Sequence, residues 1–144
     1  MITDVKPKDF NPKFTGVGIF LEHDGKILLL KRHENKPEGN TWTGPGGKVD
    51  LGETPKSAII RETFEETGVQ INPKKLITIQ TSYVRFPQYD FTWVIFRYIL
   101  DSKPEIKLHN AEHTAHQWLT PEDALKENLM QDEDYCIKKT YNLE

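Results

Sequence analysis

The chain has 144 residues, the length of one domain at about 100–200 residues per domain. Aromatic residues make up 10% of it and charged residues 28%, a composition that argues against intrinsic disorder. The net charge of −3 excludes the broad basic surface of a nucleic-acid binder, so any site for an anionic ligand must be local.

Cysteine content and apolar runs limit the class of protein further. The single cysteine, Cys136, excludes an intramolecular disulfide and a cysteine-based zinc site. The N-terminal stretch lacks the apolar segment of a signal peptide. The longest apolar runs, such as Ile27–Leu30, are far shorter than the 18 or so residues of a membrane helix. We therefore expect a soluble, cytoplasmic protein with no membrane partner.

The first third of the chain predicts an arm, a hairpin and a loop. Residues 1–13, which contain two prolines, are expected to form an extended N-terminal arm. Phe14–Glu22 and Lys26–His33 are apolar runs with β-branched residues, and the Asp24-Gly25 pair between them is typical of a tight hairpin turn. A polar loop, residues 34–40, follows.

A glycine-rich segment then leads into a helix. Thr54 is a suitable N-cap, and Pro55 stands at the first helical position, where its missing N–H costs nothing. Lys56–Thr67 contains no breaker, and Gly68 is placed to end the helix. We predict a helix of about three and a half turns.

The remaining elements complete an alternating pattern. They are predicted strands at Lys75–Val84, Phe91–Leu100 and Ala115–Leu119, a helix from Thr120 to about Asn128, and a less regular helix at Asp132–Tyr141. This order predicts an α/β protein with a mixed sheet, organised as one domain over residues 1–144.

Three carboxylates on the predicted helix suggest chemistry. At about 100° per residue, Glu62, Glu65 and Glu66 occupy about 100° of arc, with Ile60 and Phe64 on the opposite side. One interpretation is an amphipathic helix whose acidic side faces water. The other is a site for a hard divalent cation such as Mg²⁺, because the three charges repel and no lysine lies one turn away to compensate.

The glycine-rich segment favours the second interpretation. Gly46 and Gly47 allow close approach of the backbone, so that carbonyl or N–H groups there can reach an ion or an anion. Glycines that merely form a tight turn are the alternative. Next to a helix of carboxylates, however, this segment favours a metal–phosphate site.

The segment from Gly47 to Val69 resembles the signature of the Nudix hydrolases, G-x5-E-x7-R-E-U-x-E-E-x-G-U, where U is apolar. All seven fixed positions match: Gly47, Glu53, Arg61, Glu62, Glu65, Glu66 and Gly68. Such a match has a chance on the order of 10⁻⁸ per starting position at average residue frequencies. Thr63 departs from the pattern at an apolar position, where its methyl group can pack. The resemblance implies a Nudix-type α/β/α sandwich with a mixed β-sheet, and hydrolysis of nucleoside diphosphates linked to another moiety.

The resemblance also implies roles for the matching residues. Glu62, Glu65 and Glu66, with the Gly46 carbonyl, would hold Mg²⁺, for which Mn²⁺ can substitute. Any of these glutamates could be the general base. We expect Arg61 to orient a carboxylate such as Glu53 through a bidentate pair, with Glu53 serving either a structural or an outer ordering role.

Other candidates lie outside the signature helix. Glu112 stands where many relatives carry an extra ligand or base, although a solvated loop carboxylate is the alternative. Its neighbour His113 could be a base or a donor that contacts a base, but a lone loop histidine is usually solvated. Arg32 and Lys48 are candidates for phosphate contacts, together with the backbone of Gly47; surface ion pairs are the alternative for both side chains.

Four aromatic side chains could stack on a nucleobase, although most aromatics in strands belong to the core. They are Trp42, Tyr83, Phe86 and Tyr89.

These observations lead to one main hypothesis and two alternatives. The main one is a Mg²⁺-dependent pyrophosphohydrolase of a nucleoside triphosphate or a related nucleoside diphosphate derivative. A nucleotide-sugar or dinucleotide hydrolase is the alternative within enzymes, and a non-catalytic nucleotide-sensing module is the alternative outside them. A homodimer is compatible with the resemblance alone.

Overall fold

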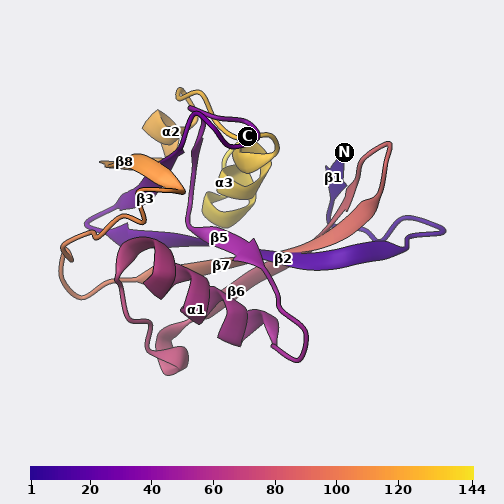
Figure 1. Cartoon of the computed structure of the whole chain (residues 1–144), viewed down its shortest axis with the longest axis horizontal. Coiled ribbons are helices and arrows are strands. Elements are labelled where there is room, and N and C mark those ends of the chain that lie inside the picture. The colour runs from indigo at the N-terminus through magenta and orange to yellow at the C-terminus, as the bar shows by residue number, and fades with distance from the viewer.

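The computed structural model describes residues 1–144 as one mixed β-sheet with helices on both faces (Figure 1). Its elements in chain order are β1 (Ile2–Thr3), β2 (Pro12–His23), β3 (Lys26–Arg32), β4 (Trp42–Thr43), β5 (Gly46–Lys48), α1 (Pro55–Thr67), the 3₁₀ turn η1 (Pro73–Lys75), β6 (Ile77–Arg85), β7 (Asp90–Ile99), β8 (His113–Leu119), α2 (Pro121–Ala124) and α3 (Glu133–Tyr141).

The strands are joined in the order β1-β6-β7-β2-β3-β4, with β5 also paired to β2 and β8 to β3. The central pair, β2 with β7, is parallel, whereas all the other pairs are antiparallel. β2 and β3 pair only near their turn, and this leaves the middle of β2 free to pair with β5. The glycine-rich segment is thereby held against the centre of the sheet.

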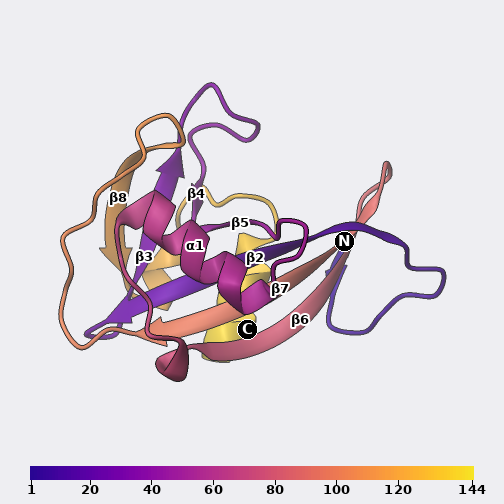
Figure 2. The same ribbon diagram turned by 60° about the horizontal axis from the view of Figure 1, so that its bottom comes forward.

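Two apolar clusters, one on each face of the sheet, form the core. The first packs α1, through Ala58 and Ile59, against β2, β3 and β7. The second packs α3, through Cys136 and Ile137, against the opposite face of the same strands. Alternation along the strands sends Leu28 to the first cluster and its neighbours to the second. The predicted α/β/α sandwich is confirmed, and Figure 2 shows α1 and α3 separated by the sheet.

The local signals that predicted the first hairpin and the signature helix act as expected. Asp24 and Gly25 both have positive φ, 53° and 73°, as the hairpin turn between β2 and β3 requires. The Thr54 side chain accepts a hydrogen bond from the Ser57 N–H and caps α1. Gly68 ends the helix in the left-handed region at φ 77°.

The two ends of the chain differ in detail from the predictions. The first residues contribute β1, which pairs with β6, and Arg85 donates hydrogen bonds to the carbonyls of Lys8 and Asp9. The helix expected to run to Asn128 ends at Ala124. Asn128 instead accepts a hydrogen bond from the Trp42 N–H at 2.9 Å, so a strand contact replaces the last helical turn.

No helix of the structure is long and apolar enough to cross a membrane.

Candidate active site

The signature helix turns Glu66, rather than Phe64, toward the sheet. Glu66 is only 8% exposed, whereas Phe64 is 53% exposed on the outer side of α1. Of the two apolar residues expected opposite the carboxylates, only Ile60 packs against the core. Thr63 is fully buried, and its hydroxyl donates to the Ile59 carbonyl at 2.6 Å. This hydrogen bond gives the buried Thr63 hydroxyl a partner at a position where the signature has an apolar residue.

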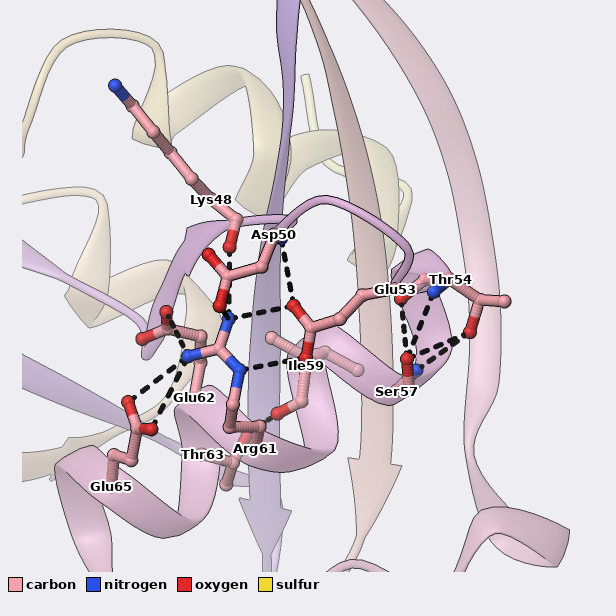
Figure 3. A network of polar contacts seen from close by, with 10 residues as sticks. All are labelled: Lys48, Asp50, Glu53, Thr54, Ser57, Ile59, Arg61, Glu62, Thr63 and Glu65. Atoms are coloured by element: carbon pink, nitrogen blue, oxygen red, sulfur yellow. Dashed lines mark hydrogen bonds and ion pairs between the residues drawn. The ribbon is translucent and has the colours of Figure 1, made fainter.

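Arg61 joins the helix to the loop that precedes it (Figure 3). Its Nε and Nη2 donate to the two carboxylate oxygens of Glu53 at 2.8 and 3.0 Å, which is the expected bidentate pair. Nη1 lies 3.0 Å from Glu62 Oε1 and 3.2 Å from Glu65 Oε2. Nη2 also contacts the Lys48 carbonyl at 3.2 Å. A single guanidinium therefore orients three glutamates.

Glu53 is a positioning residue in this network. Hydrogen bonds from Arg61, and then one from the Asp50 N–H at 2.8 Å, lower the pKa of Glu53 to about 2. Its carboxylate is thus ionised throughout the neutral range. Because both of its oxygens are engaged by the protein, Glu53 braces the loop and the helix.

The glycine strand β5 packs directly on the carboxylates of α1. The Gly46 N–H donates to Glu66 Oε1 at 3.1 Å. A Cβ at Gly47 would overlap the carboxylate of Glu62, so a larger residue there would require the Glu62 side chain to move. Burial, and then the adjoining Glu62 carboxylate, raise the pKa of Glu66 well above its ordinary value against the lowering effect of the Gly46 N–H. The structure thus places the carboxyl groups of Glu62 and Glu66 side by side, against the backbone of two residues that have no side chain.

The donor set suits a cation that needs few protein ligands. No three acidic or histidine side chains converge closely enough to enclose an ion, because Glu65 is 55% exposed and paired with Arg61. The adjoining pair is Glu62 and Glu66. Mg²⁺ is commonly held by one or two carboxylates together with waters and substrate phosphates, so this pair fits it without a closed cage.

The end of β3 and the turn before β8 carry the candidates Arg32 and Glu112. Lys36 forms an ion pair with Glu112 at 3.2 Å, and Glu112 lies near enough to Glu66 to contribute to its raised pKa. Arg32 is at the end of β3, where its Nε donates to the Pro37 carbonyl at 2.9 Å. Glu112 therefore borders Glu66 from the side of β8, and Arg32 is paired with the next residue, His113, at the end of β3.

The expectation of a solvated His113 is wrong. The side chain is 3% exposed at the start of β8, and its Nδ1 has no hydrogen-bond partner. Burial lowers the pKa of His113 to about 4, so the ring is neutral at neutral pH. His113 is enclosed beside Glu112, because β8 begins at His113 and not at the predicted Ala115.

Trp42 and Lys48 point away from the carboxylates. Trp42 packs against the apolar cluster on the α3 face of the sheet. The Lys48 side chain extends away from Glu62 and Glu65 in Figure 3, and its Nζ lies 4.5 Å from the ring centroid of Phe14. The structure brings Gly46, Gly47 and the signature residues together and leaves these two outside.

Three contacts of the site were not predicted. Asp50 Oδ2 lies 3.3 Å from Arg61 Nη2, at a position that the signature leaves open. Lys36 pairs with Glu112 from a distant loop. Glu133, at the start of α3, accepts hydrogen bonds from the Thr43 hydroxyl and the Gly44 N–H and so fastens the glycine-rich segment from the other face. No local pattern signals contacts between segments so far apart.

Comparison with known proteins agrees with this arrangement. A family model described as the NUDIX domain matches residues 12–140. The chain is 32% identical over 108 residues to a MutT-like protein of Streptomyces ambofaciens, covering 74% of this chain and 62% of that protein. It is 31% identical over 114 residues to the CTP pyrophosphohydrolase of Escherichia coli K12, covering 76% of this chain and 78% of the relative.

The fold is also similar to that of solved structures. The crystal structure of a MutT NUDIX hydrolase from Burkholderia pseudomallei superimposes with a TM-score of 0.72 at 27% identity, covering 88% of this chain and 96% of that one. The family model, these relatives and the shared fold lead to one conclusion: the chain belongs to the Nudix family of hydrolases.

Proposed function

We propose that the protein is a Mg²⁺-dependent pyrophosphohydrolase that cleaves a nucleoside triphosphate or a related nucleoside diphosphate derivative by attack of water on phosphorus. The observation that carries the proposal is the adjoining pair of Glu62 and Glu66, which packs on the backbone of Gly46 and Gly47; Arg61 holds Glu62, and the Gly46 N–H holds Glu66. The relative from Escherichia coli, a CTP pyrophosphohydrolase, supports this class of substrate.

The cation would be held by Glu62 and Glu66, with Glu65 and the Gly46 carbonyl as further ligands. When bound, Mg²⁺ neutralises phosphate oxygens and lowers the pKa of water. Mn²⁺ has the same preference for oxygen ligands and can take its place. Arg61 keeps the carboxylates in position because its guanidinium contacts both Glu62 and Glu65.

The protein's own side chains would do the remaining work. One of the three glutamate carboxylates takes the proton of the attacking water, and Glu112 borders them as a further acceptor. We expect the N–H groups of the Arg32 guanidinium that the loop leaves unbound to contact phosphate oxygens, since only its Nε donates to the loop. Lys48 would contact a phosphate farther from the carboxylates.

A substrate panel with identification of the products tests the proposal. Purified protein with Mg²⁺ is incubated with nucleoside triphosphates, nucleotide sugars and dinucleotides, and the products are separated by anion-exchange chromatography. Release of pyrophosphate and a nucleoside monophosphate is expected. Nucleotide binding without turnover, in the presence of Mg²⁺ or Mn²⁺, would instead indicate a sensing module.

A further inference from the structure

A cavity of about 300 Å³ lies where the start of β2 meets the β6–β7 turn, away from the signature helix. It is lined by Asn11, Pro12, Lys13, Gln88 and Tyr89. This part of the sheet projects beyond both α1 and α3 (Figure 1). Its volume is at the lower end of the range for small-molecule sites, and its two side-chain amides can both donate and accept hydrogen bonds.

Four aromatic rings gather beside this cavity. Phe14 and Phe91 are stacked with centroids 4.8 Å apart and planes 8° apart, and Tyr89 lies 5.9 Å from Phe14. Phe86 packs edge-on against both Tyr89 and Phe91. None of these rings is fully buried, and Tyr89 is 37% exposed. A cluster of aromatic rings left open to solvent commonly marks an interaction site.

Two lysine ammonium groups lie over these rings. Lys13 Nζ is 5.9 Å from the Tyr89 centroid, and Lys48 Nζ is 4.5 Å from the Phe14 centroid. The site therefore combines flat apolar faces with positive charge, although the whole chain has a net charge of −3. Among small ligands, a nucleotide matches both features, because its base stacks on aromatic rings and its phosphates attract ammonium groups.

Lys48 links this region to the carboxylates. Its side chain reaches Phe14, while its carbonyl accepts a hydrogen bond from Arg61 at 3.2 Å. Arg61 in turn contacts Glu62 at 3.0 Å. The Lys48 residue therefore connects the aromatic rings, at the end of its side chain, with the guanidinium that holds Glu62, at its backbone.

We propose that the cavity beside Tyr89 binds the base of the nucleotide, and that Lys48 contacts a phosphate between this cavity and the carboxylates. The inference rests on the proposed function, since it places the two ends of the same substrate. It also separates the aromatic candidates: Trp42 belongs to the core and Tyr83 packs edge-on against Phe10, whereas Tyr89 lines the cavity and Phe86 packs against Tyr89.

Steady-state kinetics of Tyr89→Ala test this placement. With the best nucleoside triphosphate, KM should rise about tenfold while kcat stays within about twofold, because stacking on a base contributes equally to the ground state and the transition state. The inhibition constant of inorganic tripolyphosphate, which has no base, should not change. Tyr89→Trp should restore the parental KM. Ile77→Ala removes a side chain of similar exposure, 40%, from the other end of β6 and should behave like the parent.

Two results would overturn the inference: a parental KM in Tyr89→Ala, or an equal loss of affinity for tripolyphosphate. A parent that hydrolyses no nucleotide would refute the proposed function instead. In that case, NMR titration of the parent with a nucleoside monophosphate still decides the inference. The side-chain amide signals of Asn11 and Gln88 should shift in the parent and not in Tyr89→Ala, and unshifted signals in the parent would refute the base site.

Discussion

The guanidinium of Arg61 contacts neighbouring protein groups through all three of its nitrogens. Nε is bound to Glu53, Nη1 to Glu62 and Glu65, and Nη2 to Glu53 and the Lys48 carbonyl. Little donor capacity is left for a phosphate. Arg61 therefore acts on the site through the carboxylates that it contacts.

At the scale of single residues, replacing Glu66 by glutamine tests the proposal that Glu62 and Glu66 bind the cation. Glu66→Gln keeps the size of the side chain and an acceptor for the Gly46 N–H but removes one negative charge. We expect kcat to fall by about 10²–10⁴-fold and the Mg²⁺ concentration for half-maximal activity to rise. The fold should persist, because the change relieves repulsion with Glu62.

Glu122→Gln is the matched control for that experiment, since Glu122 is exposed and lies in α2, which packs on the α3 face of the sheet. Its activity should equal that of the parent at every Mg²⁺ concentration. Equal activity of the two variants at limiting Mg²⁺ would show that Glu66 is not a ligand.

Glu133 makes stability depend on pH in a defined direction. Burial raises the pKa of Glu133 from 4.5 to about 7, against lowering hydrogen bonds from Thr43 and Gly44. Between these values the folded protein keeps a proton that the unfolded chain has lost, so the free energy of unfolding falls as pH rises through this window. Glu133→Gln cannot ionise. The melting temperature of the parent, measured from pH 4.5 to 8, should therefore drop relative to that of Glu133→Gln; parallel curves would contradict the assignment.

At the scale of elements, local sequence signals predicted most of the strands and the signature helix. Caps, breakers and alternation act within a few residues, and this explains why α1 and the β2–β3 hairpin were predicted nearly to the residue. The grouping of Glu62, Glu65 and Glu66 could be predicted for the same reason, because one helix carries all three. Contacts made between distant segments were not predicted.

β4, β5 and the shortened α2 are examples of what local patterns cannot show. β5 is a strand only because the middle of β2 is free to pair with it. α2 ends at Ala124 because the backbone around Leu129 bonds instead with Trp42. Similarly, the Thr43–Glu133 bond joins residues 90 positions apart. In each case a tertiary contact outweighs the local preference.

The packing of β2 against β7 gives a prediction at this scale. The Trp93 ring lies over β2, so a Cβ at Gly18 would stand 2.6 Å from Trp93 Cζ2. Gly18→Ala should lower the free energy of unfolding by about 1–3 kcal/mol, as overpacking does. Urea denaturation of the four members of a double-mutant cycle measures it. In a Trp93→Ala background the cost should vanish, and a cost that persists would mean that the ring is not its cause.

At the scale of the whole molecule, the proposed binding of a cation by Glu62 and Glu66 predicts that the cation stabilises the folded protein. A ligand that binds only the folded state raises the free energy of unfolding, by about 2.7 kcal/mol at one hundred times its Kd. Mg²⁺ or Mn²⁺ should therefore raise the melting temperature of the parent without any nucleotide, and a chelator should reverse the effect. Differential scanning fluorimetry measures this shift. It should be much smaller in Glu66→Gln, and equal shifts would place the cation elsewhere.

The parallel pairing of β2 with β7 also affects how the chain is made. β2 leaves the ribosome early, whereas β7, its partner along almost its whole length, is synthesised much later. Until then one side of β2 has no strand to pair with, and an open strand edge invites association with other nascent chains. Gly16 and Gly18, which make room for the Trp93 ring in the finished sheet, also weaken β2 as a template for such pairing.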